Sequence, residues 1–323
     1  MRAIQMSRTG GPEVLEVVDL PLPEPGPGQV RVRHAAVGIN FIDTYQRTGL
    51  YPVRLPAILG GEAAGTVEAV GEGVTRLKAG DRVAYSSGGS GGYAEAALVQ
   101  ADRAIRLPDA MTFEVAAASL LKGLTAELLL RRCAPVKSGQ TILVQAAAGG
   151  VGTILVQWAK HLGATVIGTV GSAAKAELAR SLGCDHVILY REEDVAKSVR
   201  EITGGVGVPI AYDSVGADTF EGTLASLARR GIFVSYGNAS GPAPAVEPLR
   251  LSRGGSLYLT RPTLVDYVAT LPELEEATAA LFDVILSGKV KVEIGQTFPL
   301  AEARRAHEAL HSRETIGASL LIP

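Results

Sequence analysis

Between Thr141 and Gly152 the chain reads TILVQAAAGGVG, in which an apolar β-branched strand gives way to small residues and then to a helix. A strand that turns directly into a helix leaves unpaired backbone N–H groups and the positive end of the helix dipole facing outward. Such a turn can bind a diphosphate through its backbone. We therefore predict nucleotide contacts from Ala147, Ala148, Gly149, Gly150, Val151 and Gly152.

The turn departs from the commoner GxGxxG pattern, because Ala147 stands at the first glycine position of an AxxGxxG run that begins at Ala146. A turn of small residues could alternatively serve only the close packing of a helix on a sheet. Its place after a strand, before a helix and at the start of a regular alternation favours dinucleotide binding.

Apolar strands alternate with amphipathic helices over the middle of the chain. The strands read TILVQ, ATVIGTV, HVILY, IAYDSV and GIFVSYG, and helical segments such as SAAKAELARSLG lie between them. Consecutive parallel strands need crossover helices, so the predicted class is α/β, with a doubly wound parallel-sheet (Rossmann) nucleotide domain over residues 124–265. The short strands before Phe113 predict a β-rich domain of residues 1–123 and 266–323.

The end of the second strand of this alternation indicates which dinucleotide binds. An NAD site usually carries an acidic residue there, but this strand ends GTVGSAAK, without a carboxylate. Gly171, Ser172 and Lys175 follow it, and Tyr190 ends the next strand. A hydroxyl, an ammonium group and an aromatic face suit the 2′-phosphate and adenine of NADP(H). Taken singly, Lys175 could be a solvated helix residue and Tyr190 a packing residue.

Composition excludes several other classes of protein. The 323 residues carry a net charge of -2, so no basic excess recommends a nucleic-acid partner. No apolar run approaches the roughly 20 residues that span a bilayer, and the N-terminus lacks the apolar core of a signal peptide. Cys133 and Cys184 do not form a CxxC pair, which excludes a disulfide framework. We expect a cytoplasmic enzyme.

Several segments together resemble the medium-chain dehydrogenase/reductase superfamily and, within it, the zinc-independent quinone oxidoreductases that include zeta-crystallin. The resemblance spans essentially the whole chain. It rests on GINFIDTYQRTGLYP, LGGEAAGTVEAVGEGV, GDRVAY, LLKGLTA, QAAAGGVG, YDSVG and RETIGASLLIP. It implies that the β-rich domain is a GroES-like catalytic domain.

The resemblance also implies that no metal takes part. Zinc-dependent alcohol dehydrogenases of the superfamily have a Cys and a His where this chain has Asn40 and Gly61, and they insert a four-cysteine lobe where it reads SSGGSGGYAEAALV. The five histidines lack ligand spacing, and His307 and His311 are expected on a polar helix face. Without a Lewis acid, alcohol oxidation loses its usual mechanism, whereas quinones and activated alkenes accept hydride readily.

The same resemblance places Asn40, Tyr45 and Tyr51 at the substrate and nicotinamide end, where Asn40 could donate a hydrogen bond to a quinone or carboxamide oxygen. A turn position for Asn40 and loop packing for Tyr51 are the structural alternatives. Lys122 is nearby in that resemblance but could simply be solvated. The remaining cofactor contacts implied are Asn40, Thr125, Ser214, Gly237, Asn238, Leu264 and Arg313.

These features predict an NADPH-dependent, metal-free quinone reductase. The open alternatives are an NADPH-dependent alkenal or enone reductase, a non-enzymatic crystallin-like or RNA-binding protein, and a nucleotide-sensing regulator. The segment GGSLYLTRP resembles the edge strand through which family dimers join their sheets, so we expect a homodimer, although such an edge could be capped within one chain.

Overall fold

The computed structural model describes residues 1–86, 90–312 and 315–323. These residues form two compact units. The first contains Met1–Leu124, Val268–Phe282 and Val292–Pro323, and the second contains Thr125–Tyr267 and Asp283–Lys291. Within the described residues, no helix is long and apolar enough to cross a membrane.

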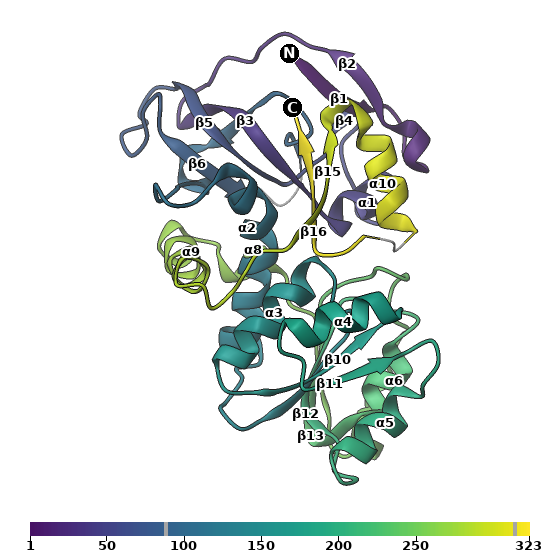
Figure 1. The fold of residues 1–323 in the computed structure, drawn as a ribbon. Helices are drawn as coiled ribbons and strands as arrows, with labels where there is room; N and C mark the ends of the chain where they lie inside the picture. Colours follow the sequence, from purple (N-terminus) through teal and green to yellow (C-terminus); the bar gives the residue numbers. More distant parts are fainter. Residues whose placement is uncertain (87–89, 313–314) are drawn as a thin grey trace. The chain divides into compact units, whose positions relative to one another are not determined.

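The first unit is β-rich (Figure 1). A seven-stranded sheet has the order β15-β16-β3-β5-β6-β8, with β7 also paired to β3, and a second sheet has the order β2-β1-β4. All pairs are antiparallel except β15 with β16. The strands are β1 (Arg2–Met6), β2 (Glu16–Asp19), β3 (Gln29–Ile39), β4 (Ala57–Ile58), β5 (Glu62–Val70), β6 (Arg82–Ser86), β7 (Ala96–Gln100), β8 (Ala104–Arg106), β15 (Ile294–Pro299) and β16 (Ala318–Ile322).

Helices complete this unit around one apolar core. The core joins side chains of β1, β3, β5 and β6 to those of the C-terminal helix α10. Helix α1 begins after its N-cap Asn40 and ends at Gly49, whose φ of 83° lies in the left-handed region that glycine adopts at low cost. The helices are α1 (Phe41–Thr48), α2 (Phe113–Glu127), α9 (Leu271–Leu286) and α10 (Ala303–His311), of which α2 and α9 continue into the second unit.

The second unit is built on a six-stranded sheet in which every pair is parallel (Figure 1). Its order is β11-β10-β9-β12-β13-β14, so β10 and β11 are added on one side of β9, and β12, β13 and β14 on the other side. Right-handed crossovers on either side of β9 place helices on both faces. The strands are β9 (Thr141–Val144), β10 (Thr165–Val170), β11 (His186–Leu189), β12 (Val208–Asp213), β13 (Leu227–Ser235) and β14 (Tyr258–Thr260).

The predicted α/β class, with a doubly wound parallel sheet and a separate β-rich part, is therefore confirmed. The helices of the second unit are α3 (Gly150–His161), α4 (Ala173–Ser181), α5 (Val195–Ile202), α6 (Phe220–Ala225), α7 (Pro248–Arg253) and α8 (Leu264–Tyr267), and a π-helical turn covers Leu128–Cys133. Helix α3 buries Ile154, Leu155, Val156 and Trp158. Its sequence GVGTILVQWAKH becomes basic in the last turn, which suits the negative end of the helix dipole.

One late segment, Asp283–Lys291, lies with the second unit, whereas the sequence placed all of residues 266–323 with the first. A side chain of α3 explains its position. The Gln157 amide donates to the carbonyl oxygen of Lys291 and accepts from the backbone N–H of Lys291, both at 2.9 Å. This reciprocal pair of hydrogen bonds resembles the pairing between two β-strands. The hydrophobic pattern of the sequence cannot predict it, because it depends on a polar side chain.

Candidate functional site

The glycine-rich turn leads from β9 into α3 at the carboxyl edge of the parallel sheet. Ala146 adopts a φ of 55°, and the N–H of Gly149 closes the turn on the Ala146 carbonyl oxygen at 2.9 Å. Helix α3 then begins at Gly150 without a side-chain cap. A helix start leaves its first N–H groups without intrahelical acceptors, so those of Gly150, Val151 and Gly152 are suited to receive a diphosphate.

Gly152 is required by a close backbone approach within this turn. A Cβ atom added there would overlap the Ala146 carbonyl oxygen and lie 2.9 Å from both Cα and carbonyl C of Ala147. The side chains of Ala147 and Ala148 are themselves buried beneath the turn. These two alanines can therefore offer a ligand only their backbone, while their methyl groups pack inside the unit.

The residues predicted to select the 2′-phosphate lie at one corner of the same edge. Ser172 is the N-cap of α4, and its hydroxyl accepts from the backbone N–H of Lys175 at 3.4 Å. Tyr190 lies over Gly171, since a Cβ on that glycine would be 2.8 Å from the phenol oxygen. The sequence reading missed Arg191, whose guanidinium carbon is 6.0 Å from the centre of the Tyr190 ring. The corner thus combines a helix start, a hydroxyl, cations and an aromatic face.

Most other predicted cofactor residues follow the ends of neighbouring strands. Ser214 follows β12 and accepts from the N–H of Ala239 at 3.2 Å, which joins its loop to the loop of Gly237 and Asn238 after β13. Leu264 begins α8 beyond β14, and Thr125 lies on α2 in the second unit. Arg313 lies outside the described residues. The carboxyl edge is where doubly wound sheets bind nucleotides.

In the first unit Tyr45 and Tyr51 contact one another, and Asn40 is the N-cap of the helix that carries Tyr45. The Tyr45 and Tyr51 rings meet edge to face with centroids 5.3 Å apart, and the N–H of Tyr51 donates to the Tyr45 carbonyl oxygen at 3.0 Å. Asn40 is 8% exposed at the start of the same helix. Its amide nitrogen donates to Glu62 Oε2 at 2.8 Å and lies 3.4 Å from the Gly38 carbonyl oxygen. The carboxylate can only accept, so this bond fixes the orientation of the amide.

Glu62 is the centre of a buried charged cluster that sequence spacing does not reveal. Its side chain has no exposed surface, and Lys122 Nζ donates to Oε2 at 2.9 Å from a side chain only 6% exposed. The backbone N–H of Leu121 donates to Oε1 at 2.6 Å. Lys122 is therefore a buried ion-pair partner, and the solvated alternative is wrong. Glu62 in turn positions the Asn40 amide.

A second buried network connects α1 to α10. Arg47 Nη1 donates to His307 Nδ1 at 3.0 Å, so the ring proton sits on Nε2 and donates to the Tyr93 oxygen at 2.9 Å. Tyr93 then donates to Asp43 Oδ2 at 2.9 Å, which also accepts from the N–H of Asn40. His307 is fully buried, so the expected polar helix face is wrong for this residue, whereas His311 is exposed as expected. His307 shares a face with the buried Ala303, Ala306 and Leu310, whose helical spacing was a usable signal.

Burial shifts the pKa of two histidines and one aspartate in this unit into or across the range between pH 3 and 7. It lowers the pKa of His307 to about 3 and that of His34 to about 4, against 6.5 in water, the neighbouring Arg47 adding to the effect on His307. Burial raises the pKa of Asp43 from 3.8 to about 7. Between pH 6.5 and 5, the two histidines bind protons almost only in the unfolded chain, whereas Asp43 is mostly protonated in the folded chain and ionised in the unfolded one.

We expect acidification to destabilise the chain by about 1 kcal/mol per pH unit near pH 5.5, where nearly two histidine protons bound by the unfolded chain oppose about one Asp43 proton bound by the folded chain. In His307→Gln, one histidine proton in the unfolded chain is balanced by the Asp43 proton in the folded chain. The free energy of unfolding should therefore change little with pH across this window. Urea unfolding at intervals from pH 5 to 6.5 measures it, with the exposed His311→Gln on the same helix as the control. A slope unchanged in His307→Gln would contradict the assignment.

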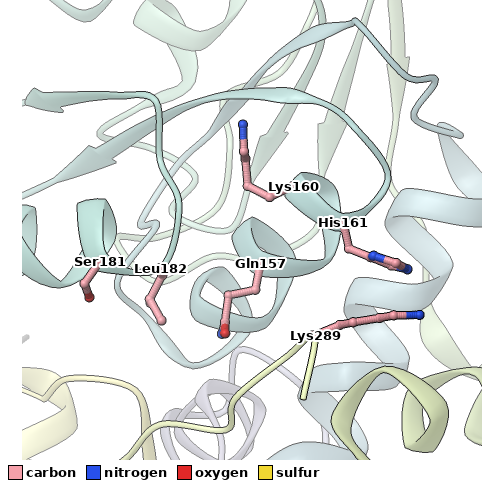
Figure 2. Close-up of a pocket in the computed structure, with 6 residues that line it drawn as sticks. All are labelled: Gln157, Lys160, His161, Ser181, Leu182 and Lys289. Atoms are coloured by element: carbon pink, nitrogen blue, oxygen red, sulfur yellow. The ribbon is translucent and has the colours of Figure 1, made fainter. Parts of the chain in front are cut away.

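A pocket of about 370 Å³ in the second unit does not coincide with these residues. Figure 2 shows its lining, which includes Gln157, Lys160 and His161 at the end of α3, and Lys289. The glycine-rich turn is at the opposite end of this 12-residue helix, about 18 Å away at 1.5 Å per residue. Lys160 is paired with Asp185 at 2.8 Å. Lys160 and His161 lie at the C-terminal end of α3, where positive charge interacts favourably with the helix dipole, and they are not among the residues predicted to bind the nucleotide.

Two family models match the chain. The alcohol dehydrogenase GroES-like domain matches residues 26–109, and the zinc-binding dehydrogenase model matches residues 150–282. The second name implies zinc, but the residues do not fit that metal. Asn40 and Gly61 replace donors, and a cation at Glu62 would have to displace the Lys122 ammonium group. Among the described residues, no group of three His, Cys, Asp or Glu could hold a metal ion.

Relatives match over the full chain. The quinone oxidoreductase of Salmonella typhimurium is 53% identical over 99% of both chains, and the 2-haloacrylate reductase of a Burkholderia species is 43% identical over 99% of this chain and 98% of its own. The crystal structure of Escherichia coli quinone oxidoreductase complexed with NADPH has a TM-score of 0.98 and 51% identity, covering all of both chains. The chain therefore belongs to the quinone oxidoreductases of the medium-chain dehydrogenase/reductase superfamily.

Proposed function

We propose that the chain is an NADPH-dependent quinone oxidoreductase. The observation that carries this function is the full-length likeness to quinone oxidoreductases, including the Escherichia coli enzyme complexed with NADPH. The second unit supports it independently, with an uncapped helix start at the carboxyl edge of a parallel sheet and no carboxylate where an NAD site carries one.

The carboxyl edge of the six-stranded sheet is the proposed NADPH site. The N–H groups of Gly150, Val151 and Gly152 hold the diphosphate, with Ala147, Ala148 and Gly149 shaping the turn. Ser172, Lys175 and Tyr190 hold the 2′-phosphate and adenine, and Arg191 adds positive charge beside Tyr190. The other proposed contacts are Asn40, Thr125, Gly171, Ser214, Gly237, Asn238, Leu264 and Arg313.

The proposed quinone pocket is formed by Asn40, Tyr45 and Tyr51 of the first unit. Bound NADPH supplies a hydride, which a quinone accepts without a metal. The Asn40 amide hydrogens already have acceptors in Glu62 and Gly38, so donation from Asn40 would compete with bonds inside the protein. Tyr45 and Tyr51 contribute edge-to-face rings that offer a surface to a flat substrate, together with their phenol hydroxyls.

Side-by-side kinetics test the substrate class. NADPH oxidation is measured with benzoquinones, naphthoquinones, enones and 2-haloacrylate, the last because of the 43% identical Burkholderia reductase. We expect quinones to give the highest kcat/KM. Oxidation of NADPH by enones or haloacrylate, with no quinone turned over, would replace the proposal by alkene reduction. Binding of NADPH without any turnover would indicate a nucleotide sensor.

Lys175→Ala tests the choice of dinucleotide. Loss of one ammonium group from a phosphate-binding corner is expected to weaken NADPH binding about 10-fold or more, at about 1.5–3 kcal/mol for a charge-assisted hydrogen bond. NADH lacks the 2′-phosphate and should be affected less than 2-fold in Kd, on the order of 0.4 kcal/mol. Fluorescence titration with each nucleotide measures both affinities. Lys197→Ala, an exposed lysine of α5 in the same unit, is the matched control. Equal losses for the two nucleotides would remove Lys175 from the 2′-phosphate site.

We also propose a cytoplasmic homodimer. Edge strand β14 pairs only with β13 among the described strands, and its Tyr258 and Leu259 are 59% and 36% exposed, an apolar edge that a second copy could cover. Both cysteines are free, as expected in a reducing compartment. Light scattering that gives a monomer mass would overturn the dimer. A salt-dependent RNA titration addresses the RNA-binding alternative.

A further inference from the structure

A chain of buried hydrogen bonds runs beneath the carboxyl edge of the six-stranded sheet. It contains Gln145 immediately after β9, Thr169 in β10, Asp213 at the end of β12, Thr219 at the N-cap of α6 and Thr223 in α6. Gln145, Thr169, Asp213 and Thr223 are each at most 1% exposed, and Thr219 is 8% exposed. Polar groups buried this deeply require partners, and here the partners are one another.

The hydrogen bonds that lead from the glycine-rich turn to Asp213 all donate in the same direction. The N–H of Ala146 lies 3.4 Å from the Thr169 hydroxyl, which donates to Gln145 Oε1. Gln145 Nε2 donates to the Thr223 hydroxyl at 2.8 Å, and Thr223 donates to Asp213 Oδ2 at 2.9 Å. Donation therefore passes from the glycine-rich turn to a buried carboxylate. Hydrogen bonds aligned in this way polarise and strengthen one another.

The carboxylate fixes the loop at the far end of the chain. Asp213 Oδ1 accepts from the backbone N–H groups of Val215 at 2.7 Å and Gly216 at 3.1 Å. Oδ2 also accepts from the Thr219 hydroxyl at 2.7 Å. The loop held by these bonds contains Ser214, and the turn at the other end contains Ala146. Both loops carry proposed NADPH contacts, although none of the side chains in this series of hydrogen bonds is itself a proposed contact.

We infer that Asp213, Thr223, Gln145 and Thr169 are positioning residues that hold the glycine-rich turn and the Ser214 loop in register for one nucleotide. This inference rests on the proposed NADPH site. A packing role alone would make each hydroxyl contribute to stability only. A positioning role makes the two ends of the hydrogen-bond chain act as one unit in NADPH binding, because an interruption anywhere between them disconnects the glycine-rich turn from the carboxylate that holds the Ser214 loop.

A double-mutant cycle separates these roles. Thr169→Val and Thr223→Val remove a hydroxyl at nearly constant volume, and each is expected to raise the Kd for NADPH about 10-fold, since displaced loops lose aligned contacts. The double variant should also lose about 10-fold rather than 100-fold, because one interruption already breaks the chain. Thr223→Ser keeps the hydroxyl and should bind NADPH within 2-fold of the parent, on the order of 0.4 kcal/mol.

Ser226→Ala is the matched control, because this buried hydroxyl of the same unit donates to the Gly222 carbonyl oxygen at 2.7 Å, outside the chain. It should lower stability without changing the Kd. Fluorescence titration gives the Kd, and urea unfolding shows which variants fold; should Thr223→Val not fold, Thr169→Val tests the other end alone. A parent protein that does not bind NADPH overturns the proposed site and this inference together. Normal parent binding with additive or absent effects overturns the inference only.

Discussion

Gly152→Ala is expected to weaken NADPH binding about 100-fold or more. The added methyl group would overlap the Ala146 carbonyl oxygen and press on the backbone of Ala147, 2.9 Å away. Backbone cannot rotate aside as a flexible side chain can, so the turn must open by about 1 Å, and a displacement of that size costs about 100-fold where binding groups must align. The affected N–H groups are those proposed to hold the diphosphate.

NADPH and NADH should lose affinity equally in this variant, because both carry the diphosphate, which distinguishes the turn from the Lys175 corner. Gly222→Ala is the control, since its Cβ would lie 3.7 Å from the nearest side-chain atom, in ordinary contact. It should leave both affinities unchanged. Circular dichroism and urea unfolding show whether Gly152→Ala folds. Unchanged NADPH affinity in a folded Gly152→Ala would place the diphosphate elsewhere.

The parallel sheet was predictable because its signals are local. Each strand from β9 to β13 is a short apolar run, and each following helix shows the helical spacing of apolar residues. TILVQ and the later strands could therefore be predicted from neighbouring residues alone. The turn at Gly149 could be placed for the same reason. The corner of Ser172, Lys175 and Tyr190 needed only the added rule that carboxyl ends of parallel strands share one edge.

The buried polar groups were less predictable because their partners are remote in sequence. His307 meets Arg47 across 260 positions, and composition alone gave no hint of that contact. The helical spacing of Ala303, Ala306 and Leu310 around His307 did carry a signal, which an expected polar face obscured. The Asp213 chain joins three strand ends through hydroxyl and amide groups, and such residues show no periodicity.

Glu62 and Lys122 show the same limit most clearly. Sixty positions separate them, and each alone is an ordinary charged residue of a strand and a helix. Only the fold reveals that both are buried and that their contact positions Asn40. The family resemblance predicted Asn40 at the substrate and nicotinamide end, but it could not show that the amide nitrogen already has an acceptor in Glu62. Details of this kind depend on three-dimensional packing.

Glu62→Gln is expected to destabilise the chain by about 3–5 kcal/mol, because it leaves the Lys122 ammonium group buried without a counter-charge. In the native protein the Glu62 carboxylate accepts only from donors, among them the Leu121 N–H at 2.6 Å. The glutamine would place a donating N–H₂ group against one of these donors. Urea unfolding at neutral pH measures the loss. Because Asn40 loses its fixed acceptor, quinone turnover should fall further than the fraction of folded protein.

Glu62→Gln combined with Lys122→Met should be more stable than Glu62→Gln alone, since an apolar side chain of similar length removes the uncompensated charge. Glu308→Gln is the surface control: it breaks the exposed pair with Arg304, whose side chains are 51% and 59% exposed, and should cost at most about 0.5 kcal/mol. A double variant as unstable as the sum of the single changes would mean that the two charges do not depend on one another. Recovery of stability without recovery of turnover would instead separate the two roles of Glu62, because Lys122→Met removes the buried charge but cannot restore the carboxylate that orients Asn40.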